Sequence, residues 1–286
     1  MTSFFLNTCI ILGTWKSLIN GVKTNRFDLI HLVMGITNIL MQSLLTVDHI
    51  LFWFLEFYDS IHLIVVFPLL FFIRFTYWPM AWLCACYCTV ITRFNHRIFI
   101  FIKKVICNFL PHLLLLSVIW SLGFTLIQFK CVMYDFSGCM KGAFNATKKS
   151  QLGAFYNFSE TLIISLDYFF PFFIIVTSLM VTVSSLLTHI WNMNKAGSDF
   201  RQNIQLHVNA ARTLMLLLLL SIAFYISTIT TLTKTYSLEN IVVVVSWVMI
   251  TMFPTAEGAI LIQANPKLRN MFLTWLSAGG LLGCRK

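Results

Sequence analysis

The residues best able to do chemistry in this chain are charged side chains that interrupt long apolar runs. Arg74, Asp167 and Glu257 each stand in such a run, where an ionisable group is costly. Each could reach a wet interface, or it could make a polar contact inside a helix bundle. Arg74 could pair with an acid of the same half of the bundle, whereas for Asp48 and Glu56 we favour the interface.

Residue groupings that define an active site are missing from the sequence. There is no His-Glu-x-x-His motif, no Gly-x-Ser-x-Gly motif and no glycine-rich phosphate loop. Cys84, Cys86 and Cys88 are two residues apart, a spacing that scatters thiols around a helix, so we expect buried free cysteines and no metal site. We therefore predict neither an enzyme nor a bound cofactor.

The composition predicts the elements that carry these residues. Hydrophobic residues make up 58% of the 286 residues and charged residues only 10%, whereas soluble domains have about 45–50% and about 25%. This composition excludes a water-soluble globular protein and indicates a membrane protein. Its apolar runs are expected to be helices, because backbone amides in lipid need partners within their own segment. We predict an all-α membrane protein, a single seven-transmembrane helix bundle with spans near residues 2–19, 29–55, 61–91, 105–128, 161–191, 211–232 and 241–264. A short tail, 265–286, follows.

The basic residues predict the orientation of this bundle. Most of the 20 Lys and Arg residues lie in connections that share one side, which the positive-inside rule assigns to the cytoplasm. The N-terminus is then outside and the C-terminus is cytoplasmic. The net charge of +10 is therefore explained by topology and by contact with anionic membrane lipids, and we expect no nucleic-acid partner.

The longest predicted connection, residues 129–160, lies outside in this topology. It contains two glycosylation sequons, at Asn145 and Asn157, and Asn145 is farther from the next span. Cys131 and Cys139 share this loop, and sequence alone leaves open whether they pair.

Three ordered stretches carry a family resemblance. One is Trp78 followed by Cys86-Tyr87 and Phe94-Asn-His96, and a second is His207-Val-Asn-Ala-Ala-Arg212-Thr213. The third runs from Pro254 through Asn265-Pro-Lys-Leu-Arg269. Together they resemble the bitter taste receptor family, the type 2 taste receptors, over almost the whole chain.

The chain departs from the family pattern at several positions. Asn38 stands where the family has Arg, Glu257 where it has His, and Val90 where it has Lys. Asn7 aligns with the first-span Asn of the family, so roughly ten residues of the usual outer end are absent. We expect a divergent member whose N-terminus is either shortened or mis-started.

The resemblance implies a plasma-membrane, multi-pass receptor for bitter or toxic small molecules that activates a gustducin-type heterotrimeric G protein. Trp78 aligns with the pocket tryptophan of the family, and other side chains lie at comparable depth. The predicted ligand-binding residues are Trp78, Trp82, Ser165, Tyr168, Phe224, Tyr225 and Trp247. Helix packing or an interfacial aromatic belt is the alternative for these aromatic residues.

The predicted G-protein-facing residues form the positive side of the bundle. They are Arg93, Arg97, Lys103, Lys104, His207 and Arg212. Topology and lipid contact would explain most of these charges equally well. Two other functions stay open: a vomeronasal type 1-like pheromone receptor, which shares the architecture, and a small membrane transporter, for which an internal repeat would be expected.

Overall fold

The computed structural model describes residues 2–19, 26–54, 58–92, 97–140, 165–185, 188, 191, 201–232 and 241–278, and every regular element among them is a helix. The helices are α1 (Thr2–Ile19), α2 (Arg26–Phe54), α3 (Tyr58–Phe75), α4 (Tyr77–Ile91) and α5 (Arg97–Met140), then a helical segment Ser165–Ser185, and then α7 (Arg201–Leu232), α8 (Ile241–Ala264) and α9 (Pro266–Ala278).

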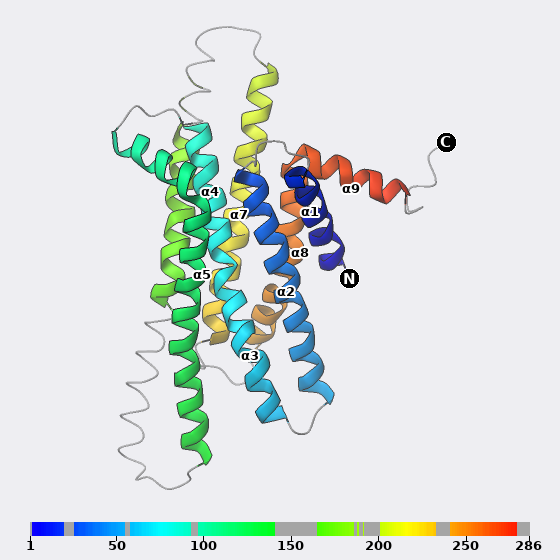
Figure 1. The fold of residues 1–286 in the computed structure, drawn as a ribbon, viewed down its shortest axis with the longest axis vertical. Coiled ribbons are helices and arrows are strands. Elements are labelled where there is room, and N and C mark those ends of the chain that lie inside the picture. Colours follow the sequence, from blue (N-terminus) through cyan, green and yellow to red (C-terminus); the bar gives the residue numbers. More distant parts are fainter. Residues whose placement is uncertain are drawn as a thin grey trace.

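The long helices run alternately up and down the bundle (Figure 1). Among the described residues, six helical stretches are long and apolar enough to cross a membrane: Arg26–Leu51, Ile64–Ile91, Asn108–Lys130, Ser165–Ser185, Arg212–Thr231 and Val244–Ala264. The chain is thus a multi-pass helical membrane protein. The predicted first span is the helix α1, which packs against α2 and α8 but is not among these six stretches.

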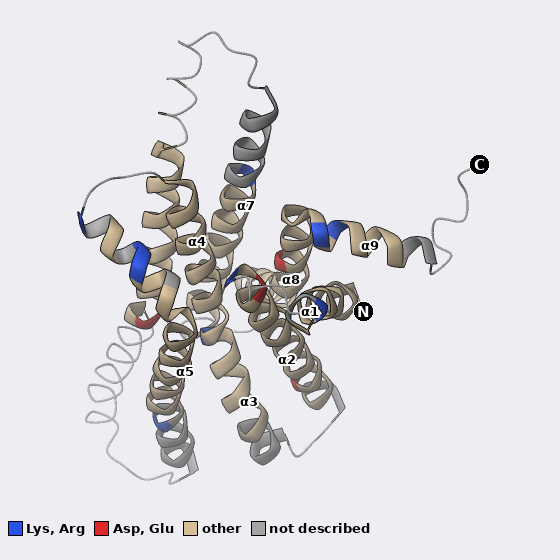
Figure 2. Ribbon diagram, turned by 45° about the horizontal axis from the view of Figure 1, so that its top comes forward, with Lys and Arg blue, Asp and Glu red and all other residues tan. Residues whose placement is uncertain are grey.

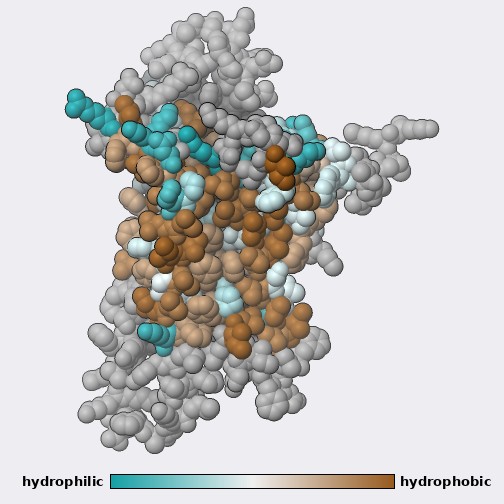
Figure 3. Space-filling model, viewed as in Figure 1, coloured by the Kyte–Doolittle hydropathy of each residue, from teal (hydrophilic) through white to brown (hydrophobic). Residues whose placement is uncertain are grey.

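Hydroxyl side chains sit within these apolar helices because each can bond to a carbonyl one turn back. Thr14 donates to the carbonyl of Ile10 and Thr37 to that of Val33, both over 2.8 Å, so neither hydroxyl is left unsatisfied in lipid. Large apolar side chains cover the outside of the bundle as well as its core, and Figure 3 shows the resulting belt.

The predicted third span is interrupted at Thr76, between α3 and α4. Pro79 has no amide hydrogen and its ring crowds the carbonyl of Phe75, which favours an interruption of the helix at this place. Thr76 bonds back to the Phe72 carbonyl through both its amide (3.0 Å) and its hydroxyl (2.8 Å). The break lies directly before Tyr77 and Trp78.

Two segments that were predicted as loop and tail are helical in part. α5 continues to Met140, so the first part of the predicted loop 129–160 is helical; no glycine or proline stands between Phe129 and Gly138 to end it. The predicted short tail begins with the helix α9. Asn265 caps the start of α9, because its side-chain oxygen accepts a hydrogen bond of 3.0 Å from the backbone amide of Lys267. Pro266 then occupies the first helical position, where proline is favoured.

α9 lies across the end of the bundle against α1 (Figure 1). The rings of Phe5 and Phe272 are 5.8 Å apart, and Leu268 is buried. Gly13 of α1 makes room for α9, because a Cβ there would come within 2.5 Å of the Met271 side chain.

Candidate functional site

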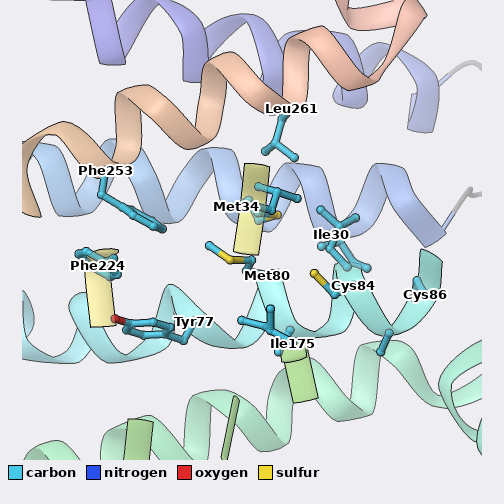
Figure 4. Close-up of a cluster of buried hydrophobic side chains, with 14 of the residues drawn as sticks. Ile30, Met34, Tyr77, Met80, Cys84, Cys86, Ile175, Phe224, Phe253 and Leu261 are labelled. Atoms are coloured by element: carbon cyan, nitrogen blue, oxygen red, sulfur yellow. The ribbon is translucent and has the colours of Figure 1, made fainter. Parts of the chain in front are cut away.

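The centre of the bundle is filled by an aromatic stack that joins α4, α7, α8 and the segment Ser165–Ser185. The ring of Phe224 lies 3.9 Å from that of Phe253 and 5.0 Å from that of Tyr77, and Tyr168 meets Tyr77 edge to face at 5.1 Å. All four side chains are buried. Figure 4 shows Tyr77, Phe224 and Phe253 converging on one another. We call these four residues the central stack.

Trp78 and Trp82 lie on another side of α4, facing α5. Their rings are 6.0 Å apart, and Trp120 of α5 meets Trp78 at 6.1 Å. The Trp82 indole donates to the Ser117 hydroxyl over 2.9 Å. These tryptophans are half-buried, so they combine an accessible apolar surface with a polar anchor, as small-molecule sites do.

A buried ion pair connects the tryptophan group to the central stack. Arg74 of α3 donates to Asp167 and to Gln128 of α5, and the Trp120 indole donates to the other oxygen of Asp167 over 2.9 Å. The guanidinium also lies 5.4 Å from the Tyr168 ring centre, within the range of a cation–π contact. Of the two readings of Arg74 and Asp167, the contact inside the bundle is therefore correct.

The predicted ligand-binding residues therefore fall into several groups. Tyr168 and Phe224 belong to the central stack, and Trp78 and Trp82 to the tryptophan group. Tyr225 stacks on Phe172 at 5.0 Å, Trp247 meets His49 at 6.1 Å, and Ser165 is half-buried. Their role in binding an agonist stays a prediction.

One cavity opens between α4, α5 and the segment Ser165–Ser185. It has a volume of about 460 Å³, and Trp82, Leu113 and Ile174 line it together with Cys88 and Thr177. Trp82 is the one predicted ligand-binding residue in its wall. The cavity extends from Trp82 toward the end of the bundle at which α4 ends and α5 begins, because Phe101 and Thr89 also line it.

Basic side chains gather at that end, which we call the basic end. Described residues there are Lys16, Arg26, Arg97, Lys103, Lys104, Arg212, Lys267 and Arg269. Figure 2 shows these charges on the bundle. Of the predicted G-protein-facing residues, Arg97, Lys103, Lys104 and Arg212 are exposed at this end. Arg93 and the His207 side chain lie outside the described residues, as do Asn145, Asn157 and the side chains of Cys131 and Cys139.

The three thiols Cys84, Cys86 and Cys88 are free and buried, as predicted. Within the described part of the chain, no group of three or more His, Cys, Asp or Glu residues is close enough to hold a metal ion.

Glu257 of α8 is buried in a polar contact between three helices near the basic end. The side-chain amide of Asn38 in α2 donates a hydrogen bond of 2.7 Å to one carboxylate oxygen of Glu257. The same nitrogen donates a second hydrogen bond, of 3.1 Å, to the side-chain oxygen of Asn7 in α1. Asn7 donates to the carbonyls of Pro254 (3.1 Å) and Ser3 (2.9 Å). Of the two readings of Glu257, the contact inside the bundle is therefore correct.

Several residues of these sites were not predicted. Tyr77, Phe253, Trp120 and Gln128 are central to the packing, yet each belongs to an apolar run in which a core residue resembles a lipid-facing one. The Pro79 break next to Trp78 was the usable signal for Tyr77, since a residue at a kink is oriented by it.

Comparison with known proteins identifies the class. A family model described as taste receptor protein (TAS2R) matches residues 1–279. The human taste receptor type 2 member 2 is 23% identical over 280 residues, covering 95% of this chain and 90% of the relative. The gorilla taste receptor type 2 member 4 is 26% identical over 273 residues, covering 92% and 89%.

The matched family consists of G-protein-coupled receptors and is not an enzyme class. This chain is a member of the type 2 taste receptor family. The resemblance seen in the sequence is confirmed, and the pheromone receptor and transporter alternatives are set aside.

Proposed function

We propose that this protein is a plasma-membrane receptor that detects bitter or toxic small molecules and activates a gustducin-type G protein. The observation that carries the proposal is the family match across residues 1–279. The topology proposed with it has seven spans, with α1 as the first, the N-terminus outside and the basic end in the cytoplasm. The gathering of exposed Lys and Arg at that end supports this orientation.

The proposed agonist site lies around Trp78 and Trp82, near the middle of the stretch Ile64–Ile91. The half-buried tryptophans offer aromatic faces for an apolar or cationic agonist. Trp120 of this group donates a hydrogen bond to Asp167. Tyr168 contacts both Arg74 of the ion pair and Tyr77 of the central stack. An agonist that binds the tryptophans more tightly in one arrangement of α4 and α5 would shift the receptor toward that arrangement.

The proposed G-protein surface is formed by Arg97, Lys103, Lys104 and Arg212. These side chains are exposed at one end of the bundle and on two different helices, α5 and α7. A positive surface attracts acidic groups of a partner and speeds their association. Contact of the same residues with anionic lipid headgroups is also expected.

The test of the agonist site is a calcium assay in cells that carry a promiscuous G protein, with a panel of bitter compounds. Trp78→Ala removes one face of the tryptophan group and should raise the half-maximal agonist concentration about tenfold or more, equivalent to about 1.4 kcal/mol. Trp15→Ala is the matched control, since Trp15 is an exposed tryptophan at the basic end, and its response should equal that of the unaltered receptor. Equal agonist potency in both variants at equal surface expression would remove Trp78 from the site.

A further inference from the structure

The cavity of about 460 Å³ between α4, α5 and the segment Ser165–Ser185, which we call the lateral cavity, opens toward the outside of the bundle. Phe101 in its wall is 67% exposed, and Trp82 and Val181 are half-buried. Most of the wall belongs to stretches that are long and apolar enough to cross a membrane. The opening therefore faces the hydrocarbon region of the bilayer, and a ligand would enter from the lipid phase.

The wall of the lateral cavity disfavours a charged ligand. None of the described residues that line it carries a charge, and a charged group in apolar surroundings is strongly unfavourable without a partner. Aromatic and aliphatic side chains, Trp82 and Phe101 among them, offer dispersion contacts to an apolar molecule. The volume lies in the range of small-molecule sites, about 300–1,000 Å³. The wall thus suits a small, uncharged and largely apolar molecule.

One hydroxyl group in this wall is available to a ligand. Thr89 donates to the carbonyl of Cys86 over 2.9 Å, and Thr177 donates to that of Phe173 over 2.7 Å. The Ser178 hydroxyl has no hydrogen-bond partner among the described residues. A hydroxyl can both donate and accept a hydrogen bond, and an alcohol offers the same two capacities. The ligand that matches the wall is therefore an apolar molecule with one hydroxyl group.

We propose that the lateral cavity binds an uncharged apolar alcohol that enters from the bilayer. The alcohol hydroxyl pairs with Ser178, and the apolar part fills the space lined by Trp82 and Phe101. The lateral cavity is separate from the proposed agonist site, because Trp78 does not line it.

Trp82 connects the two sites. It lines the lateral cavity, and its ring lies 6.0 Å from that of Trp78. An alcohol that contacts Trp82 should therefore change the response to an agonist bound at Trp78. This effect on the response rests on the proposed function, whereas the binding of the alcohol does not.

Photolabelling of the purified full-length receptor in nanodiscs tests the binding. The probe is octanol that carries a diazirine group, and the labelled residues are identified by mass spectrometry. Labelling should saturate with probe concentration, fall when excess unlabelled octanol is present, and concentrate on residues 101–113 and 174–181. A diazirine-bearing octane, at equal concentration in the bilayer, should bind about fivefold more weakly, because it cannot form the hydrogen bond.

Two pairs of variants locate the alcohol. Val181→Trp fills the cavity and should abolish the saturable labelling. Its matched control is Val248→Trp, at a residue of α8 that is 50% exposed and lies outside the wall, and this variant should label like the unaltered receptor. Ser178→Ala should weaken octanol binding about fivefold, whereas Ser184→Ala, at an exposed serine of the same segment, should not. If Val181→Trp does not fold, competition by unlabelled octanol in the unaltered receptor decides.

Labelling that does not saturate and follows the lipid exposure of the described helices would overturn the proposal and leave acyl chains as the filling of the cavity. Saturable labelling that persists in Val181→Trp would also overturn it, because the alcohol would then bind elsewhere. Saturable labelling of the cavity in a receptor that responds to no bitter compound would support the site and count only against the proposed function.

Discussion

Replacing Arg74 with Met should largely remove the receptor from the cell surface. The substitution keeps the length of the side chain but leaves Asp167 without its ion-pair partner and Gln128 without its donor. Asp167 is 3% exposed, so its charge cannot reach water. Removing one partner of a buried ion pair typically costs about 3–5 kcal/mol, a large share of the stability of most proteins.

The measurement is surface labelling of an N-terminally tagged receptor, with Lys130→Met as the matched control. Lys130 is an exposed basic residue of α5, two positions after Gln128, and its replacement should leave surface expression unchanged. The double variant Arg74→Met with Asp167→Leu should recover part of the loss, because no unpaired charge remains. Normal surface expression of Arg74→Met would mean that the ion pair does not stabilise the bundle.

Replacing Phe224 with Ala should destabilise the folded bundle by about 3 kcal/mol. The ring is 1% exposed and contacts both Phe253 and Tyr77, so its removal leaves a cavity between α4, α7 and α8. In lipid the loss comes from packing contacts rather than from transfer out of water. A change of this size lowers Tm by about 6–12 °C.

Melting of the purified variants provides the comparison for Phe224. Ile226→Ala is the control, since Ile226 lies two positions further along α7 and is 59% exposed, so its methyl groups face outward. The Phe224→Leu variant should fall between the two, because Leu fills part of the space. A Tm for Phe224→Ala equal to that of Ile226→Ala would contradict the central stack as a stabilising contact.

The apolar runs were sufficient to predict the helices of the bundle. α1 and α8 have the bounds expected from sequence, since each run is closed by polar residues. α5 and α7 are longer than predicted, because helices extend beyond the apolar segment wherever no breaker follows. α9 was not predicted because its 13 residues do not form a long apolar run, although Asn265-Pro266 is a recognisable helix start.

The sequence indicated which buried polar residues would need partners, but it did not indicate which partners they would find. Arg74 could be expected to find an acid, yet Gln128 and Trp120 could be added only once α5 was positioned. Glu257 and Asn38 stood out as departures from the family, but their 2.7 Å contact depends on how α2 and α8 cross. Hydrophobic patterning determines which residues are in spans, and it does not determine which spans meet.

The measurement that tests the receptor function most directly is nucleotide exchange on a purified gustducin-type G protein. The receptor is reconstituted in nanodiscs, a panel of bitter compounds is added, and binding of a non-hydrolysable GTP analogue is followed. The account predicts that at least one compound accelerates exchange in a dose-dependent way. It also predicts that Arg97→Glu combined with Lys103→Glu reduces this acceleration without changing agonist affinity. A folded receptor that binds an agonist but leaves exchange at its basal rate would contradict coupling to this G protein.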